Sequence, residues 1–139
     1  MLIKRLFDGI VSFIGIVVLF APAVIIAVLV KIYSRGPILY RQERIGKKAQ
    51  RFTCIKFCTM NPGYESLGSI TTSSDSRITA IGRLLRGYKL DELPQLFNVL
   101  IGKMSFVGPR PDVPGYADKL LGDDRWILEL RPGITGPAS

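Results

Sequence analysis

Residues 10–32 read IVSFIGIVVLFAPAVIIAVLVKI, an apolar stretch in which Lys31 carries the only charge. About 20 apolar residues suffice for a helix to cross a lipid bilayer. A signal peptide would have a shorter apolar segment, of about 7–15 residues, followed at once by a small-x-small cleavage site. The stretch therefore predicts a helix that spans or enters a membrane.

Pro22 lies in the middle of this stretch. Proline donates no N–H and its ring clashes with the carbonyl group of residue i−4, here Val18, so we expect the helix to bend at Ala21 and Pro22. The stretch alone favours a kinked helix that spans the bilayer over a re-entrant helix that leaves on the face it entered. Basic residues flank both ends, so the charges assign no orientation, although they also suit a helix with both ends on the cytoplasmic face. The flanking basic residues are Lys4, Arg5, Lys31 and Arg35.

The composition agrees with a membrane setting. The chain has 139 residues, enough for one domain, with a formal net charge of +8 and a positive mean hydropathy. This combination favours anionic lipid or anionic substrates over nucleic acid, which would leave the apolar stretch without a role. The absence of histidine excludes histidine acid–base chemistry and histidine metal ligands. Cys54 and Cys58 form a C-x3-C pair that is a poor zinc site, and we expect ordinary buried thiols.

A β-hairpin is predicted after the apolar stretch. Two short segments with β-branched and aromatic residues, 38–44 and 52–57, flank a basic turn at residues 46–48. Residues 61–76 are rich in Gly, Ser, Thr and Asn and predict a long loop.

Three later segments have apolar residues at helical spacing, namely 77–89, 93–101 and 115–130. The first also carries a basic rim, which suits equally a solvated face of a core helix and a helix lying on anionic headgroups. The chain is therefore expected to be an α+β protein, mostly helical, with a membrane segment at residues 1–36 and a second domain at residues 37–139. The rim residues are Arg77, Arg83, Arg86 and Lys89.

Asp91 and Glu92 open the segment 93–101, with Pro94 in its expected first turn. The simpler interpretation is a carboxylate that caps the helix and contributes about 1 kcal/mol. The alternative is phosphate chemistry, in which one carboxylate attacks phosphorus and the other holds a divalent cation. Spacing alone favours the cap. Arg110 lies between two prolines, a stiff setting that suits either bidentate phosphate recognition or a surface ion pair.

Short motifs follow one another along the chain in a distinctive order. They are KRLFD (4–8), FAP (20–22), KFCTM (56–60), RIT (77–79), LDELPQLFNVL (90–100), MSFVGPRP (104–111) and RPGITG (131–136). Each is weak alone, but the ordered set resembles the bacterial sugar transferase family, the small monotopic phosphoglycosyl transferases. The resemblance implies a re-entrant, proline-kinked membrane helix at Ala21 and Pro22, amphipathic interfacial helices, and a catalytic domain on the cytoplasmic face of the bacterial inner membrane.

The resemblance also implies a reaction. Asp91 would attack the β-phosphorus of a UDP-sugar, release UMP and carry a covalent phosphosugar until a polyprenol phosphate accepts it. Glu92 would hold Mg²⁺ during both steps. The reaction would be the first membrane step in the assembly of a glycoconjugate, a polysaccharide or glycoprotein. The residues implied to contact phosphate or nucleotide are Arg86 and Arg110, with Lys56 and Arg131 as further candidates for the anionic pocket.

The chain departs from the family pattern in several places. Ala21 replaces the serine that commonly precedes the membrane proline and cannot satisfy a backbone group freed by a kink. Cys58 replaces a basic residue, and Lys103 replaces an acidic one. Family members commonly continue well past Gly136, so a C-terminally truncated chain is expected. The alternative function is then an inactive membrane-surface module that binds anionic lipid or a partner. Gly9 and Gly15 would also allow close helix contact between copies, as in a homo-oligomer.

Overall fold

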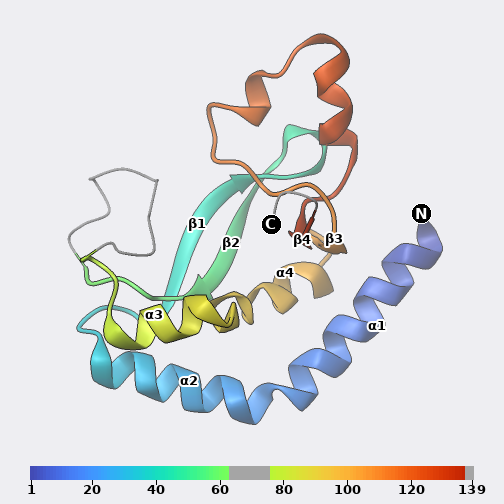
Figure 1. Ribbon diagram of the computed structural model, residues 1–139. Helices are drawn as coiled ribbons and strands as arrows, with labels where there is room; N and C mark the ends of the chain where they lie inside the picture. The colour runs from blue at the N-terminus through green and yellow to red at the C-terminus, as the bar shows by residue number, and fades with distance from the viewer. Residues whose placement is uncertain (63–75, 137–139) are drawn as a thin grey trace. The chain divides into compact units, whose positions relative to one another are not determined.

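The computed structural model describes residues 1–62 and 76–136 (Figure 1). It is a mixture of helix and sheet, as predicted, and most of the predicted loop at 61–76 lies outside the described residues. The helices are α1 (Leu2–Val18), α2 (Phe20–Tyr33), α3 (Ala80–Gly87) and α4 (Gln95–Leu100). The strands are β1 (Leu39–Ile45), β2 (Arg51–Phe57), β3 (Ser105–Val107) and β4 (Gly133–Thr135). The 3-10 segments are η1 (Lys47–Ala49), η3 (Leu90–Glu92), η4 (Ala117–Lys119) and η5 (Gly122–Glu129).

The described chain forms two compact units that alternate along the sequence. The first unit contains residues 1–18, 41–55 and those from 95 onward, and the second contains residues 19–40 and 56–94. The hairpin β1–β2, which the sequence predicts correctly, contributes residues to both units. The predicted division into a membrane segment and a catalytic domain concerns insertion into lipid, and it stays a prediction.

A break at Leu19 separates α1 from α2, in place of the bend predicted at Ala21 and Pro22. Leu19 has φ −92° and ψ 7°, and its carbonyl accepts the Ala23 N–H at 2.9 Å as the helix resumes. Pro22 therefore lies in the first turn of α2, where a missing N–H costs no intrahelical hydrogen bond. α1 ends at Val18, whose carbonyl has no donor at position 22. No single described helix is long and apolar enough to cross a membrane, but α1 and α2 together, bent at this break, are so by length and composition.

α1 buries two polar side chains, Asp8 and Ser12, and exposes most of its apolar ones. Asp8 and Ser12 are only 3 % and 0 % exposed. The two terminal nitrogens of Arg5 donate to the carbonyl oxygens of Val99 and Leu100, both at 2.6 Å, and so satisfy the C-terminal end of α4. The exposed apolar side chains are Leu2, Ile3, Leu6, Phe7, Ile10, Phe13, Ile14, Val17 and Val18. This outer face is suited to lipid or to a partner rather than to water.

The core of the first unit gathers residues from β2, α4 and the turn after α4. Its buried members are Phe52, Cys54, Val99 and Met104. β3 and β4 pair in parallel, with Ser105 opposite Gly133. Sequence reasoning missed this pairing because each strand has only three residues and β3 lies in a turn-rich segment.

The prediction of one helix at 115–130 is wrong. The structure has two separate 3-10 segments there, η4 and η5. Leu120 and Leu121 between them are extended, with ψ 133° and 158°, and Gly122 begins η5 at φ +68°. Apolar spacing near that of a helix still buries Leu128 against Ile45, but it does so without a continuous helix.

The second unit packs α2 against α3, and the predicted helix within 77–89 is confirmed. Thr79 caps α3, because its Oγ1 accepts the Gly82 N–H at 3.0 Å. Both cysteines are free and buried, as predicted. The buried core residues are Ile26, Val30, Phe57, Cys58, Ile81 and Leu85.

Candidate functional site

Asp91 and Glu92 lie in the 3-10 turn η3, directly before α4 rather than in its first turn. The Leu93 N–H donates to the Leu90 carbonyl at 3.3 Å, and Pro94 has no N–H with which to extend α4 backward. No side chain caps η3, and the Asp91 carboxylate accepts its own backbone N–H. The position of these carboxylates is therefore not explained by the capping of a helix.

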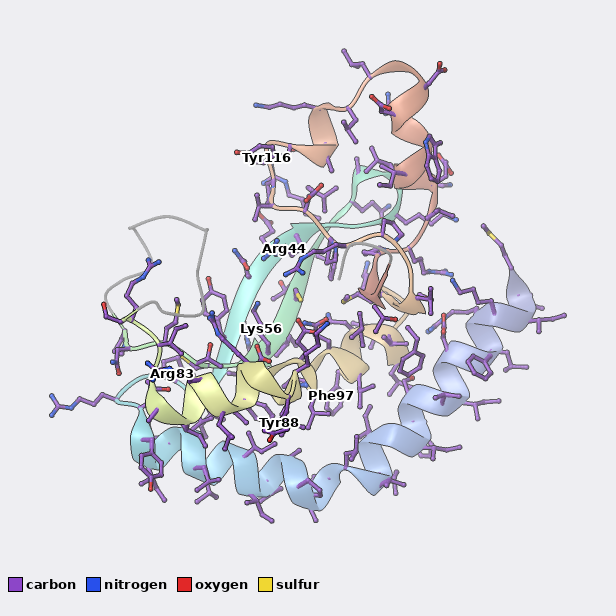
Figure 2. The ribbon with its side chains drawn as sticks, in the orientation of Figure 1. Arg44, Lys56, Arg83, Tyr88, Phe97 and Tyr116 are labelled. Atoms are coloured by element: carbon purple, nitrogen blue, oxygen red, sulfur yellow. The ribbon has the colours of Figure 1, made fainter. Side chains whose placement is uncertain are left out.

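Asp91 is a buried carboxylate among cations. The residue is only 8 % exposed, and burial raises its pKa above the ordinary value, while the positive charges of Lys56 and Arg86 and, more weakly, Lys89 oppose that shift. Lys56 belongs to β2 and lies beside α3, which carries Arg86 (Figure 2). Three neighbouring pieces of chain in the second unit thus converge on one acid, an arrangement common at functional sites.

Thr59 holds Arg86 in place. The Arg86 Nε donates to Thr59 Oγ1 at 2.8 Å. The Thr59 carbonyl in turn accepts the Thr79 N–H at 3.0 Å and the Thr79 hydroxyl at 3.3 Å. Gly82 approaches the same carbonyl so closely that a β-carbon would overlap it. α3 is thereby docked on Thr59, which fixes the guanidinium near Asp91. Thr59 lies in the motif KFCTM (56–60), but the sequence alone does not single it out as a site residue.

Glu92 follows Asp91 in η3 and is half-buried. Among residues 1–62 and 76–136, no three His, Cys, Asp or Glu side chains gather as a metal site. Mg²⁺, however, is commonly held by one or two carboxylates together with substrate phosphates and water. The adjacent pair therefore fits a cation that is bound together with phosphate.

The other predicted site residues are distributed over both units. Arg110 and Arg131 belong to the first unit, where Arg110 is exposed and the Arg131 Nε donates to the Gly102 carbonyl at 3.0 Å. Ala21 and Pro22 belong to the second unit, in the first turn of α2. The structure thus brings Lys56 and Arg86 to Asp91, and the roles of Arg110 and Arg131 stay predictions.

Two departures from the family pattern have a clear structural setting. Cys58 packs in the core of the second unit, and its Sγ donates to the Met60 carbonyl at 3.3 Å. No basic side chain could occupy that core position without a change in packing. Lys103 is exposed in the turn after α4, so its charge does not have to be compensated locally.

Comparison with known proteins assigns the family. The profile described as bacterial sugar transferase matches residues 1–139, and the chain belongs to this family. It is 38 % identical to the UDP-N-acetylgalactosamine-undecaprenyl-phosphate N-acetylgalactosaminephosphotransferase of Aeromonas hydrophila, over 96 % of this chain and 33 % of that protein. It is 40 % identical to the undecaprenyl-phosphate glucose phosphotransferase of Komagataeibacter xylinus, over 98 % and 27 %.

A shorter relative is covered more fully. The chain is 38 % identical to the putative undecaprenyl-phosphate N-acetylgalactosaminyl 1-phosphate transferase of Bacillus subtilis, over 87 % of this chain and 68 % of that protein. The chain thus spans about a third or less of the first two relatives' length and about two thirds of the third.

Proposed function

We propose that this chain carries the catalytic site of a phosphoglycosyl transferase, which moves a sugar 1-phosphate from a UDP-sugar to a polyprenol phosphate. The observation that carries the proposal is the buried Asp91 carboxylate with Lys56 and Arg86 beside it. The names of the relatives support the acceptor, undecaprenyl phosphate, and one of them names a UDP-sugar.

Asp91 acts as the nucleophile in the proposed reaction. One of its carboxylate oxygens bonds to the β-phosphorus, the bond from that phosphorus to the bridging oxygen breaks, and UMP leaves with the electron pair. Lys56 and Arg86 favour the ionised carboxylate and neutralise charge on the phosphate it attacks. An oxygen of polyprenol phosphate then attacks the same phosphorus, and Asp91 leaves as a free carboxylate.

Glu92 is the residue proposed to hold Mg²⁺, next to Asp91 in the chain. A bound Mg²⁺ supplies positive charge that stabilises the phosphates during transfer. The carboxylate of Glu92 would hold that charge beside the nucleophile, and the hydrogen bond from Arg86 to Thr59 orients the guanidinium.

A monotopic arrangement in the bacterial inner membrane is proposed for the chain, with both helix ends on the cytoplasmic face. The outer face of α1 is apolar, and in the second unit Leu84 of α3 and Tyr88 directly after it are 54 % and 73 % exposed. A re-entrant path needs a break in the helix, and the break at Leu19 supports such a path. Such a placement puts Asp91 at the lipid surface, where a polyprenol phosphate presents its headgroup.

Substitution of the carboxylates tests the proposal. We expect Asp91→Asn to lower UMP release by about 10³-fold or more and to abolish the phosphosugar adduct seen by intact-protein mass spectrometry, because the nucleophile is lost. Glu92→Gln should lower UMP release and raise the Mg²⁺ concentration needed for half-maximal rate. Lys119→Gln, an exposed change in η4, serves as the control. Unchanged UMP release by Asp91→Asn would show that another group attacks the phosphorus.

A further inference from the structure

A hollow in the first unit is lined mainly by cations. Its volume is about 160 Å³, and it lies between the turn that joins β1 to β2 and the turn that follows α4. All of its lining residues belong to the first unit, whereas Asp91 belongs to the second. The charged side chains that line it are Lys47, Lys48, Arg51, Lys103 and Arg131.

These charges are largely uncompensated. Arg51 pairs with Glu43 at 3.3 Å, and no carboxylate lines the hollow itself within the described chain. The side chains of Lys47, Lys48 and Lys103 have no acidic partner among residues 1–62 and 76–136. Like charges held this close repel one another, so an anion in the hollow would relieve the repulsion.

The backbone around the hollow is fixed in an unusual conformation. Lys48 and Ala49 have φ 57° and 58°, in the left-handed region that residues other than glycine rarely adopt. The turn is closed by the hydrogen bond from the Gly46 N–H to the Gln50 carbonyl, 2.8 Å. Strained turns of this kind are enriched at ligand sites. This turn fixes the backbone positions from which the side chains of Lys47 and Lys48 extend.

The opposite wall is fixed as well. Gly102 has φ +87°, and its carbonyl accepts the Arg131 Nε at 3.0 Å. That bond uses only one nitrogen of the guanidinium. The two terminal nitrogens have no partner in the described part of the chain, and their planar fork matches two oxygens of a phosphate.

We propose that this hollow of the first unit is a binding site for a phosphoryl anion carrying at least two negative charges. Arg131 supplies the oriented contact, and Lys47, Lys48 and Lys103 supply positive charge around it. The same chemistry is available from two sources, the headgroup of an anionic membrane lipid and a soluble diphosphate. The proposal does not depend on catalysis at Asp91.

The two sources are separated by two measurements on the full chain. The first is titration of inorganic pyrophosphate into protein in a neutral detergent at about 0.15 M ionic strength, followed by calorimetry and by the NMR shifts of the Lys48 and Gly102 amides. The second is binding to phosphatidylcholine vesicles with and without phosphatidylglycerol. The test variant is Lys47→Gln with Lys48→Gln. The control is Lys119→Gln with Arg125→Gln, which removes the same charge from exposed positions outside the hollow.

We expect the test variant to weaken anion binding by at least about tenfold and the control by less than about twofold, because only the test variant removes two positive charges from the lining of the hollow. Pyrophosphate binding with amide shifts at Lys48 and Gly102 identifies the soluble source. A phosphatidylglycerol preference that only the test variant loses identifies the lipid headgroup. Absence of both effects, or equal losses in the two variants, overturns the proposal.

Discussion

Asp91 is subject to two opposing influences at the scale of one residue. Burial favours the neutral acid, and the charges of Lys56 and Arg86 favour the carboxylate, with burial the stronger of the two. A carboxylate that is ionised yet poorly hydrated is a better nucleophile than one in water. The same conflict means that its ionised form lowers the stability of the fold.

The stability of Asp91→Asn follows from this conflict. The folded-state pKa lies above the ordinary value of 3.8, so the neutral form contributes stability that is complete below pH 3.8 and lost as pH rises through the folded pKa. At neutral pH we therefore expect Asp91→Asn, which stays uncharged, to have a higher free energy of unfolding than wild type. The difference should shrink as the pH falls toward 3.8.

Denaturant unfolding across this pH range measures the effect, with Asp123→Asn, an exposed change, as the control. A helix cap would behave in the opposite way. Its loss would cost about 1 kcal/mol at neutral pH, and that result would restore the capping interpretation.

Gly82 decides how one element, α3, docks on its neighbour. A methyl group there would overlap the Thr59 carbonyl, so we expect Gly82→Ala to destabilise the protein by about 1–3 kcal/mol and to displace Arg86. Gly87→Ala at the end of the same helix meets nothing within 4 Å and should be neutral or stabilise by up to about 1 kcal/mol. Thermal unfolding and UMP release measure both effects. Equal behaviour of the two variants would mean that the close approach has no structural role.

Ser105 joins β3 to α1. Its hydroxyl donates to the buried Asp8 carboxylate at 2.7 Å. We expect Ser105→Ala to cost about 1.5–3 kcal/mol, because a hydrogen bond to a charged group is lost in a buried place. Ser12→Ala is the control, since the equally buried Ser12 hydroxyl donates only to the nearby Gly9 carbonyl and its loss should cost about 1 kcal/mol or less. A smaller loss for Ser105→Ala than for Ser12→Ala would contradict the assignment.

Elements with a strong local pattern were predictable from sequence. The turn of the hairpin lies at the basic residues Lys47 and Lys48. α3 has a capping residue, Thr79, and apolar residues at helical spacing. Elements defined by distant partners were not. β3 is recognisable only through its pairing with β4. The sequence places the bend at Ala21 and Pro22, because the proline is visible there, whereas the helix breaks at Leu19. The contact between Asp8 and Ser105, 97 residues apart, is likewise not visible in local sequence.

The candidate site shows the same contrast between residues in a local motif and residues placed by distant contacts. The motif identifies Asp91 and Glu92, and the family resemblance implies Lys56 and Arg86, whose charges act on Asp91 in the structure. Thr59 was not proposed, because nothing in its local sequence shows that its hydroxyl faces an arginine 27 residues later. Contacts over such separations depend on the packing of α3 rather than on local pattern.

At the scale of the whole molecule, the path of the N-terminal helices through the membrane is the main prediction. We expect cysteines at Leu2 and Arg35, both exposed, to react with a membrane-impermeant maleimide only in inverted vesicles, because the proposed arrangement puts both helix ends on the cytoplasmic face. The background carries alanine in place of the buried Cys54 and Cys58.

A cysteine at the exposed Thr135 is the control for the cytoplasmic side. Labelling of Leu2→Cys and Arg35→Cys from opposite sides would mean that α1 and α2 span the bilayer. Labelling of both from the outer side alone would reverse the proposed orientation.

The buried polar stripe of α1 sets the order in which the nascent chain can assemble. Asp8 is synthesised 97 residues before Ser105, and Arg5 precedes its acceptors by 94 and 95 residues. At about 5–20 residues per second, the ribosome takes roughly 5–20 s to cover that separation. If α1 enters lipid as proposed, these polar groups would be costly to place there until their partners have been made. Under that proposal, insertion of α1 would be among the last steps in the assembly of this chain.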